Sequence, residues 1–157
     1  MEVEIEKQSA IIKIDALPKV WAIKSQMQQL FQNLVSNGIK FRKQEELPII
    51  SIYKETSKDA TVGKAFHRII VEDNGIGFDD KYAEEIFLVF KRLHSYHEYE
   101  GTGVGLSICK KIIDRHKGRI LAQGKLNEGA RFIIELPMIK RPVPVLDVEM
   151  DKISLEE

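Results

Sequence analysis

Short hydrophobic runs, bounded by polar or glycine-containing stretches, predict most of the β-strands of this chain. Side chains of a strand alternate between two faces, so such runs are typical of strands that bury at least one face. The predicted strands are Ala10–Asp15, a short extended piece around Val20 and Trp21 after a turn at Leu17 and Pro18, Ile49–Glu55, Ala65–Asp73, Arg119–Lys125 and Ala130–Pro137. Residues 56–64 and 127–129 are rich in turn-forming types, so we expect two hairpins, one across each stretch.

Helical spacing of apolar residues predicts three helices. The first runs from Ser25, a candidate N-cap, to about Phe41, and the second is a short helix around Lys81–Phe90. The third runs from about Gly103 to His116, with Gly118 as its C-cap glycine. Strands adjacent at both ends of the chain, with helices between them, predict an α/β fold. We expect a two-layer sandwich in which three helices cover one face of a mixed sheet, and the other face is largely solvated.

The chain of 157 residues is about as long as one domain. We expect a charged N-terminal stub at residues 1–9, a folded domain at 10–138, and an acidic, proline-containing tail or linker at 139–157. Val143, Val145 and Leu146 could dock the tail on the domain.

Charge and cysteine content exclude several classes of protein. Acidic and basic residues number 24 each, so no excess positive charge favours nucleic acid or an anionic membrane. Cys109 is the only cysteine, which rules out an internal disulfide and suits a reducing compartment, the cytoplasm by default. The charged N-terminus is unlike a signal peptide, and no apolar run approaches the roughly 20 residues that span a bilayer.

The first predicted helix carries a polar stripe beside its apolar one. Gln29, Asn33, Asn37 and Lys40 follow each other at spacings of four, four and three, so they share one face. Asparagine is a poor helix former, which suggests that a ligand or a metal ion uses these amides. Mg²⁺ prefers oxygen ligands and keeps waters and phosphates, so Asn37 could hold it while Lys40 neutralises phosphate. The alternative is that both amides simply bridge local backbone.

Alternation along the strand before DNGIGF places His67, Ile69, Val71 and Asp73 on one face. If this face lies under the helices, Asp73 reaches the floor of a pocket. An ionised carboxylate only accepts hydrogen bonds, so it suits the amino group of adenine and would repel the oxygen of guanine. Gly75 and Gly77 would let the main chain approach the purine closely. The alternative is a surface Asp-Asn-Gly turn.

The run GTGVGL starts the last predicted helix, where free backbone N–H groups bind phosphate readily. Its residues are Gly101, Thr102, Gly103, Val104, Gly105 and Leu106. The run is neither a Walker A loop nor a dinucleotide fingerprint, because no Gly-Lys-Ser/Thr follows and Leu106 stands where the last glycine would be. The preceding polar segment is typical of a lid that orders over a nucleotide. None of the four histidines is predicted to accept phosphate; His67, His94 and His116 are expected in packing or surface roles.

Four motifs in fixed order, QNLVSNGIKF, DNGIGF, FLVFKRLH and GTGVGL, resemble the N box, first glycine box, F box and second glycine box of sensor histidine kinases. The similarity covers about residues 11–138 and is strongest to phytochrome-type kinases. It identifies the chain as the catalytic ATP-binding domain of a histidine kinase, within the superfamily of gyrase, Hsp90, histidine kinase and MutL. The implied fold is the Bergerat-type α/β sandwich, and the implied cofactors are ATP and Mg²⁺.

The resemblance also implies roles for individual residues. Asn37 is the magnesium ligand, Asn33 and Lys40 lie near the phosphates, and Phe41 lies beside the adenine. Asp73 reads the adenine, Gly75 and Gly77 shape that wall, and Lys91 or Arg92 approaches the γ-phosphate. Gly101, Gly103 and Gly105 lie in the hinge of the lid. Gly38 departs from the alanine common among relatives and should weaken the helix by about 1 kcal/mol.

The implied partners are a histidine-bearing dimerisation domain and a response regulator downstream. The residues before Ala10 are too few to form the phosphorylated helices, so we expect ATP binding without autophosphorylation by the isolated chain. ATP-hydrolysing relatives carry glutamate at the position of Asn33, whose amide is no base, so hydrolysis should be slow. The rival interpretations are a non-catalytic, nucleotide-dependent interaction module (a pseudokinase) and an ATPase of the gyrase and chaperone type.

Overall fold

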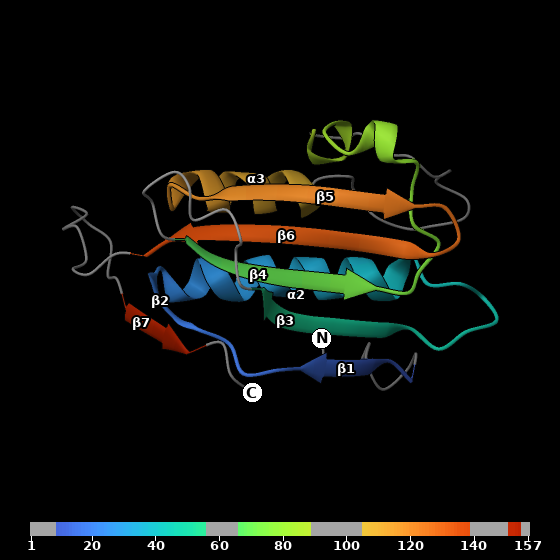
Figure 1. Ribbon diagram of the computed structural model, residues 1–157, viewed down its shortest axis with the longest axis horizontal. Helices are drawn as coiled ribbons and strands as arrows, with labels where there is room; N and C mark the ends of the chain where they lie inside the picture. The colour runs from blue at the N-terminus through green and yellow to red at the C-terminus, as the bar shows by residue number, and fades with distance from the viewer. Residues whose placement is uncertain (1–8, 56–65, 89–104, 139–150, 155–157) are drawn as a thin grey trace.

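The computed structural model describes residues 9–55, 66–88, 105–138 and 151–154 of the chain. Five strands form one mixed sheet in the order β1-β3-β4-β6-β5, in which β1 and β3 run parallel and the other neighbours antiparallel (Figure 1). The strands are β1 (Ile11–Ile14), β3 (Ile49–Glu55), β4 (Phe66–Asp73), β5 (Arg119–Lys125) and β6 (Gly129–Pro137). Both expected hairpins are therefore confirmed as antiparallel pairs, β3 with β4 and β5 with β6.

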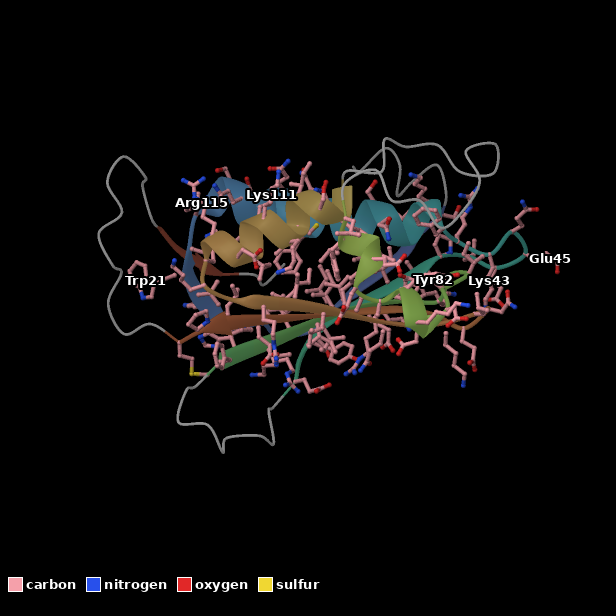
Figure 2. All side chains as sticks on the ribbon, turned by 90° about the horizontal axis from the view of Figure 1, so that it is seen from above. Trp21, Lys43, Glu45, Tyr82, Lys111 and Arg115 are labelled. Atoms are coloured by element: carbon pink, nitrogen blue, oxygen red, sulfur yellow. The ribbon has the colours of Figure 1, made fainter. Side chains whose placement is uncertain are left out.

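Two α-helices lie side by side on one face of this sheet (Figure 2). They are α2 (Lys24–Lys40) and α3 (Gly105–Arg115). Buried residues of both helices and of the facing strands form one core, which contains Met27, Leu30, Leu34, Ile50, Ile69, Cys109, Ile113, Phe132 and Ile134. The predicted α/β class and the two-layer arrangement are confirmed.

The second predicted helix, Lys81–Phe90, is not an α-helix in the residues that the structure describes. Two 3₁₀ turns replace it, η2 (Asp80–Tyr82) and η3 (Glu85–Phe87). Their backbone N–H groups bond to carbonyls three residues earlier, as from Tyr82 to Asp79 and from Leu88 to Glu85. Because 3₁₀ turns repeat every three residues, their apolar spacing resembles that of an α-helix over so short a segment.

Both predicted caps are wrong in detail. The N-cap of α2 is Ile23, not Ser25, and it makes no side-chain cap hydrogen bond. The Ile23 N–H instead donates to Nε2 of His116 at 3.0 Å, while Nδ1 of that ring lies 2.7 Å from the Ile112 carbonyl. Because Nε2 accepts this bond, Nδ1 is the ring nitrogen that donates to the Ile112 carbonyl. A residue at the end of α3 thus supports the start of α2, which local sequence could not reveal.

The end of α3 is a Schellman turn that uses Lys117, not Gly118, in the left-handed conformation. Lys117 has φ +61°, its N–H donates to the Asp114 carbonyl at 3.1 Å, and the Gly118 N–H donates to the Ile113 carbonyl at 3.0 Å. Gly118 is small for another reason, because a Cβ there would lie 2.3 Å from the carbonyl oxygen of Glu135. Close packing against β6 therefore requires this glycine.

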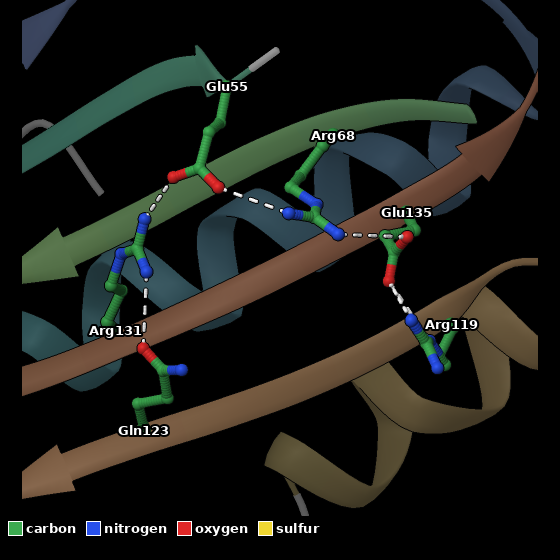
Figure 3. A network of polar contacts seen from close by, with 6 residues as sticks. All are labelled: Glu55, Arg68, Arg119, Gln123, Arg131 and Glu135. Atoms are coloured by element: carbon green, nitrogen blue, oxygen red, sulfur yellow. Dashed lines mark hydrogen bonds and ion pairs between the residues drawn. The ribbon is translucent and has the colours of Figure 1, made fainter. Parts of the chain in front are cut away.

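The face of the sheet opposite the helices is less solvated than expected. Ile70 and Ile133 lie on it as cross-strand neighbours and are 0% and 7% exposed. A network of charged side chains crosses this face (Figure 3). Glu55 on β3 contacts Arg68 on β4 at 3.1 Å and also contacts Arg131 on β6. Because β4 lies between β3 and β6, the contact with Arg131 crosses β4 diagonally, above Ile70. The stems of these long side chains shield aliphatic surface while their charges stay paired.

Glu135 joins the other end of this network from a nearly buried position. Its side chain is 8% exposed and contacts Arg119 at 2.5 Å and Arg68 at 3.5 Å. In the same network, burial alone would raise the pKa of Glu55. The hydrogen bonds and charges of Arg68 and Arg131 outweigh burial and lower this pKa. The network therefore favours the ionised form of Glu55.

We expect Glu135→Gln to lower the free energy of unfolding by about 2 kcal/mol, because it removes the charge of a nearly buried carboxylate that is bonded to Arg119 and ion-paired with the partly buried Arg68. Glu128→Gln is the matched control, since Glu128 pairs with Lys125 at 2.8 Å on the exposed hairpin. Urea denaturation of both variants checks this. Equal midpoints for the two variants would contradict a structural role for the network.

A second, two-stranded sheet lies beside the main one. β2 (Lys19–Ala22) pairs antiparallel with β7 (Asp151–Ser154), which comes from the segment expected as a tail or linker (Figure 1). The short extended piece around Val20 and Trp21 is confirmed as β2. Val143, Val145 and Leu146 lie outside the described residues, and the boundaries at residues 9 and 138 stay predictions.

Candidate nucleotide-binding site

The last turn of α2 carries three of the predicted site residues. Asn37 and Lys40 are half-buried, and the Phe41 N–H that follows closes the helix on the Asn37 carbonyl at 3.1 Å. The Nζ atom of Lys40 lies 5.0 Å from the centre of the Phe41 ring. A cation is favoured at this end of a helix, where the backbone carbonyls carry partial negative charge.

Gly38 lets this turn approach the end of β4. A Cβ at Gly38 would lie 3.1 Å from the Ile50 side chain and 3.3 Å from Cβ of Asp73. The glycine expected to weaken the helix therefore stands where α2 packs directly on the strand that carries Asp73. In this way the fold brings together the Asn37 turn and Asp73, which are 36 positions apart in sequence.

Asp73 is held from one side by backbone donors. The Gly75 N–H donates to its Oδ1 at 2.9 Å, and the Ala130 N–H of the neighbouring strand also bonds to the carboxyl group. Burial raises the pKa of Asp73 to about 6, the charge of Glu72 adds to this, and the two backbone hydrogen bonds act in the opposite direction. The carboxylate is thus ionised at neutral pH but poorly solvated, so an additional hydrogen-bond donor would stabilise it.

Gly75 and Gly77 are required by close approaches of backbone to backbone. A Cβ at Gly75 would lie 2.5 Å from the carbonyl oxygen of Phe41, which accepts the Ile76 N–H at 2.9 Å. Gly77 has φ +63°, and a Cβ there would lie 2.2 Å from the carbonyl oxygen of Lys125. These contacts fix the loop after Asp73 between α2 and the β5–β6 hairpin. Their predicted approach to a purine stays a prediction.

Asn74 is a residue whose role the sequence reasoning missed. Its Oδ1 accepts the Ile49 N–H at 2.8 Å, and its Nδ2 donates to the Leu47 carbonyl at 3.0 Å. Both groups belong to the chain just before and at the start of β3. Asn74 therefore anchors the glycine loop to the neighbouring strand, whereas the Asp-Asn-Gly sequence alone indicates only a turn.

Asn33 points toward α3. Its Nδ2 donates to the carbonyl oxygen of Gly105 at 3.3 Å, a backbone group 72 positions away in sequence, whereas the alternative expected a bridge to local backbone. Gly105 is exposed and Leu106 half-buried at the start of α3. The other predicted site residues lie outside the described part of the chain: Lys91, Arg92, Gly101, Thr102, Gly103 and Val104.

The donor set near Asn37 is compatible with Mg²⁺ and unlike a metal centre made of protein ligands alone. The described residues hold no group of three or more His, Cys, Asp or Glu side chains that could bind a metal ion. Mg²⁺ in nucleotide sites takes few protein oxygens and fills its other positions with water and phosphate. A single half-buried amide oxygen beside a lysine fits that pattern.

The chain belongs to the family of histidine kinase-, DNA gyrase B- and HSP90-like ATPases, which matches residues 22–140. Among its relatives are cyanobacterial phytochrome A of Nostoc, 47% identical over 134 residues, and the phytochrome-like protein Cph1 of Synechocystis, 43% identical over 134 residues. Each alignment covers 85% of this chain but 17% of the relative, so the chain spans about one sixth of their length. Sensor protein RprX of Bacteroides fragilis is 35% identical over 125 residues, which are 78% of this chain and 23% of that protein.

Solved structures agree with this assignment. The catalytic domain of histidine kinase ThkA superimposes with a TM-score of 0.67 at 31% identity, covering 87% of this chain and 84% of that one. Full-length ShkA in complex with AMPPNP shares the fold with a TM-score of 0.69 at 21% identity, covering 92% of this chain and 29% of that one. The domain is therefore of the histidine kinase catalytic type. In the described residues, no helix has the length and apolar character needed to cross a membrane.

Proposed function

We propose that this chain is the ATP-binding catalytic domain of a two-component sensor histidine kinase. It donates the γ-phosphate of ATP to a histidine on a separate dimerisation domain, from which a response regulator takes the phosphate. The reducing cytoplasm suits its single, buried cysteine.

The environment of the Asp73 carboxylate is the main support for this proposal. This carboxylate accepts hydrogen bonds from the Gly75 and Ala130 N–H groups, and burial raises its pKa to about 6. The Asp73 side chain lies next to Gly38, which is in the same helical turn as Asn37. An ionised, poorly solvated acceptor is stabilised by an additional donor such as the exocyclic amino group of adenine. Guanine offers an oxygen at the same place, so the site should prefer ATP to GTP.

The remaining residues bind and orient the nucleotide. Phe41 follows the last turn of α2, where its ring can lie beside the purine, and Lys40 neutralises phosphate charge. Asn37 would hold Mg²⁺, which supplies neutralisation of the phosphate oxygens when it is bound. Phosphoryl transfer needs little covalent chemistry from the protein, so positioning and charge neutralisation are sufficient for this domain.

The first test is nucleotide titration of the wild type and Asn37→Ala, with and without Mg²⁺. We expect wild type to bind ATP at least tenfold more tightly with Mg²⁺ than without, and to prefer ATP to GTP. Asn37→Ala should lose the Mg²⁺-dependent gain and keep the base preference, because it removes the amide oxygen and leaves Asp73 untouched. Isothermal calorimetry measures the affinities of both proteins for ATP and GTP, with and without Mg²⁺. A variant with the full Mg²⁺-dependent gain would contradict the metal assignment.

The second test separates a kinase from a non-catalytic module. The chain is mixed with a histidine-bearing dimerisation domain and labelled ATP, and acid-labile phosphohistidine is measured. Labelling that Asn37→Ala abolishes supports the proposal. Tight ATP binding without any labelling would favour a nucleotide-dependent interaction module.

A further inference from the structure

A polar seam joins α2 and α3 within their otherwise apolar contact. The Asn33 amide donates to the Gly105 carbonyl at 3.3 Å, and Sγ of Cys109 lies 3.8 Å from the Leu30 carbonyl, to which it donates. Asn33 also hydrogen-bonds to the Cys109 side chain, which opposes the burial that raises the pKa of this thiol to about 12. Two residues of each helix therefore meet in one cluster of hydrogen bonds.

The spacing of these residues makes the seam specific in register. Leu30 and Asn33 lie three positions apart on α2, and Gly105 and Cys109 lie four apart on α3, so each pair shares a helix face. Leu30 and Cys109 are both 0% exposed, so the thiol bond is within the core and Asn33 closes the seam toward its edge. Sliding one helix along the other would leave the buried thiol and the Asn33 amide without these partners.

We propose that Asn33 is a positioning residue that clasps the first residue of α3 to α2. The consequence for catalysis rests on the proposed function. Asn37 lies one turn beyond Asn33 on α2, and Gly105 ends the run predicted to bind phosphate. The clasp thus sets the separation between the metal ligand and the phosphate-binding end of α3. The family resemblance implies only a place near the phosphates for Asn33, and the clasp adds this positioning role.

The clasp can be tested without nucleotide through Cys109. This residue is the only cysteine of the chain and is 0% exposed, so a thiol reagent reaches it only when the seam opens. We expect Asn33→Ala to raise the rate of reaction with dithiobis(nitrobenzoic acid) five- to tenfold, as for the loss of one hydrogen bond. Gln28→Ala is the matched control, because Gln28 is an exposed amide on the same helix, and its rate should equal that of wild type.

Nucleotide affinity distinguishes positioning from a merely structural bond. Asn33→Ala should weaken ATP binding five- to tenfold and change adenosine binding less than twofold, because adenosine lacks the phosphates that α3 is predicted to hold. An unchanged ratio of ATP to adenosine affinity, with faster labelling, would reduce the seam to a structural contact and overturn the positioning role. Weaker ATP binding with unchanged labelling would show a direct phosphate contact and overturn the clasp.

Two controls keep these outcomes clear. Circular dichroism establishes that Asn33→Ala is folded, and if it is not, Asn33→Ser must show the same acceleration of labelling for the clasp to stand. If wild type binds neither ATP nor adenosine, the proposed function fails, and the positioning role with it. Unchanged labelling of a folded variant rejects the clasp whether or not the nucleotide proposal holds.

Discussion

Asp73→Asn should weaken ATP binding about 100-fold at pH 7.5 and, at the same time, make the nucleotide-free domain more stable. The loss reflects replacement of a charge-assisted hydrogen bond to the adenine amino group by a neutral one. The gain arises because burial holds the pKa of Asp73 at about 6, well above its ordinary 3.8. Asparagine removes the poorly solvated charge and can still accept the Gly75 N–H. A substitution that weakens ATP binding but stabilises the nucleotide-free domain indicates that Asp73 serves binding and not folding.

The sign of the pH dependence follows from the raised pKa. A carboxyl group whose pKa is higher in the folded state contributes stability that is fully present below pH 3.8 and is lost as the pH rises through about 6. The advantage of Asp73→Asn in free energy of unfolding should therefore be about 1–3 kcal/mol at pH 7.5 and absent near pH 3.5. His67, whose pKa burial lowers, destabilises the fold as the pH falls below about 6.5, but it is common to both proteins and cancels in their difference.

Urea denaturation at both pH values and ATP titration at pH 7.5 measure these effects. Asp80→Asn is the matched control, because Asp80 also accepts a backbone N–H, from Gly124 at 3.1 Å, but is exposed. Asp80→Asn should leave ATP affinity unchanged. If Asp73→Asn binds ATP as tightly as wild type does, Asp73 is not the adenine acceptor.

Gly77→Ala should destabilise the domain by about 4 kcal/mol or more, enough to unfold much of it at 37 °C. Gly77 has φ +63°, a left-handed conformation that costs a residue with a side chain about 1–2 kcal/mol. Its Cβ would also lie 2.2 Å and 2.5 Å from the carbonyl oxygens of Lys125 and Gly129. These oxygens belong to the β5–β6 hairpin backbone and can move only if the hairpin shifts.

Gly105→Ala is the control for Gly77→Ala, because Gly105 is the first residue of α3 and no residue that the structure describes lies within 4 Å of a Cβ placed there. Alanine there should leave stability unchanged or raise it by up to about 1 kcal/mol. Thermal unfolding followed by circular dichroism compares the two variants. Similar midpoints would mean that the loop after Asp73 adapts freely, contrary to its close backbone contacts.

Pattern and turn chemistry were sufficient for most of the secondary structure. The strands Ile49–Glu55 and Arg119–Lys125 were predicted with the bounds that the structure has, because alternation and glycine-containing turns are local signals. The helix expected at Lys81–Phe90 failed because 3₁₀ and α spacing coincide over so few residues. Gly118 was predicted to end the helix because local rules favour glycine there. In the structure Lys117 adopts the left-handed conformation instead, and Gly118 is required because a side chain there would clash with β6.

The sequence by itself determined the α/β class, the hairpins and the four motifs that assign the chain to its family, since each depends on residues close together in the chain. Only the tertiary structure decided which residues from distant segments meet. It placed Asn33 against Gly105, His116 against the start of α2, and the charged network over Ile70. Such contacts depend on how whole elements pack, and an asparagine that faces a helix carbonyl has the same local sequence as one that faces a phosphate.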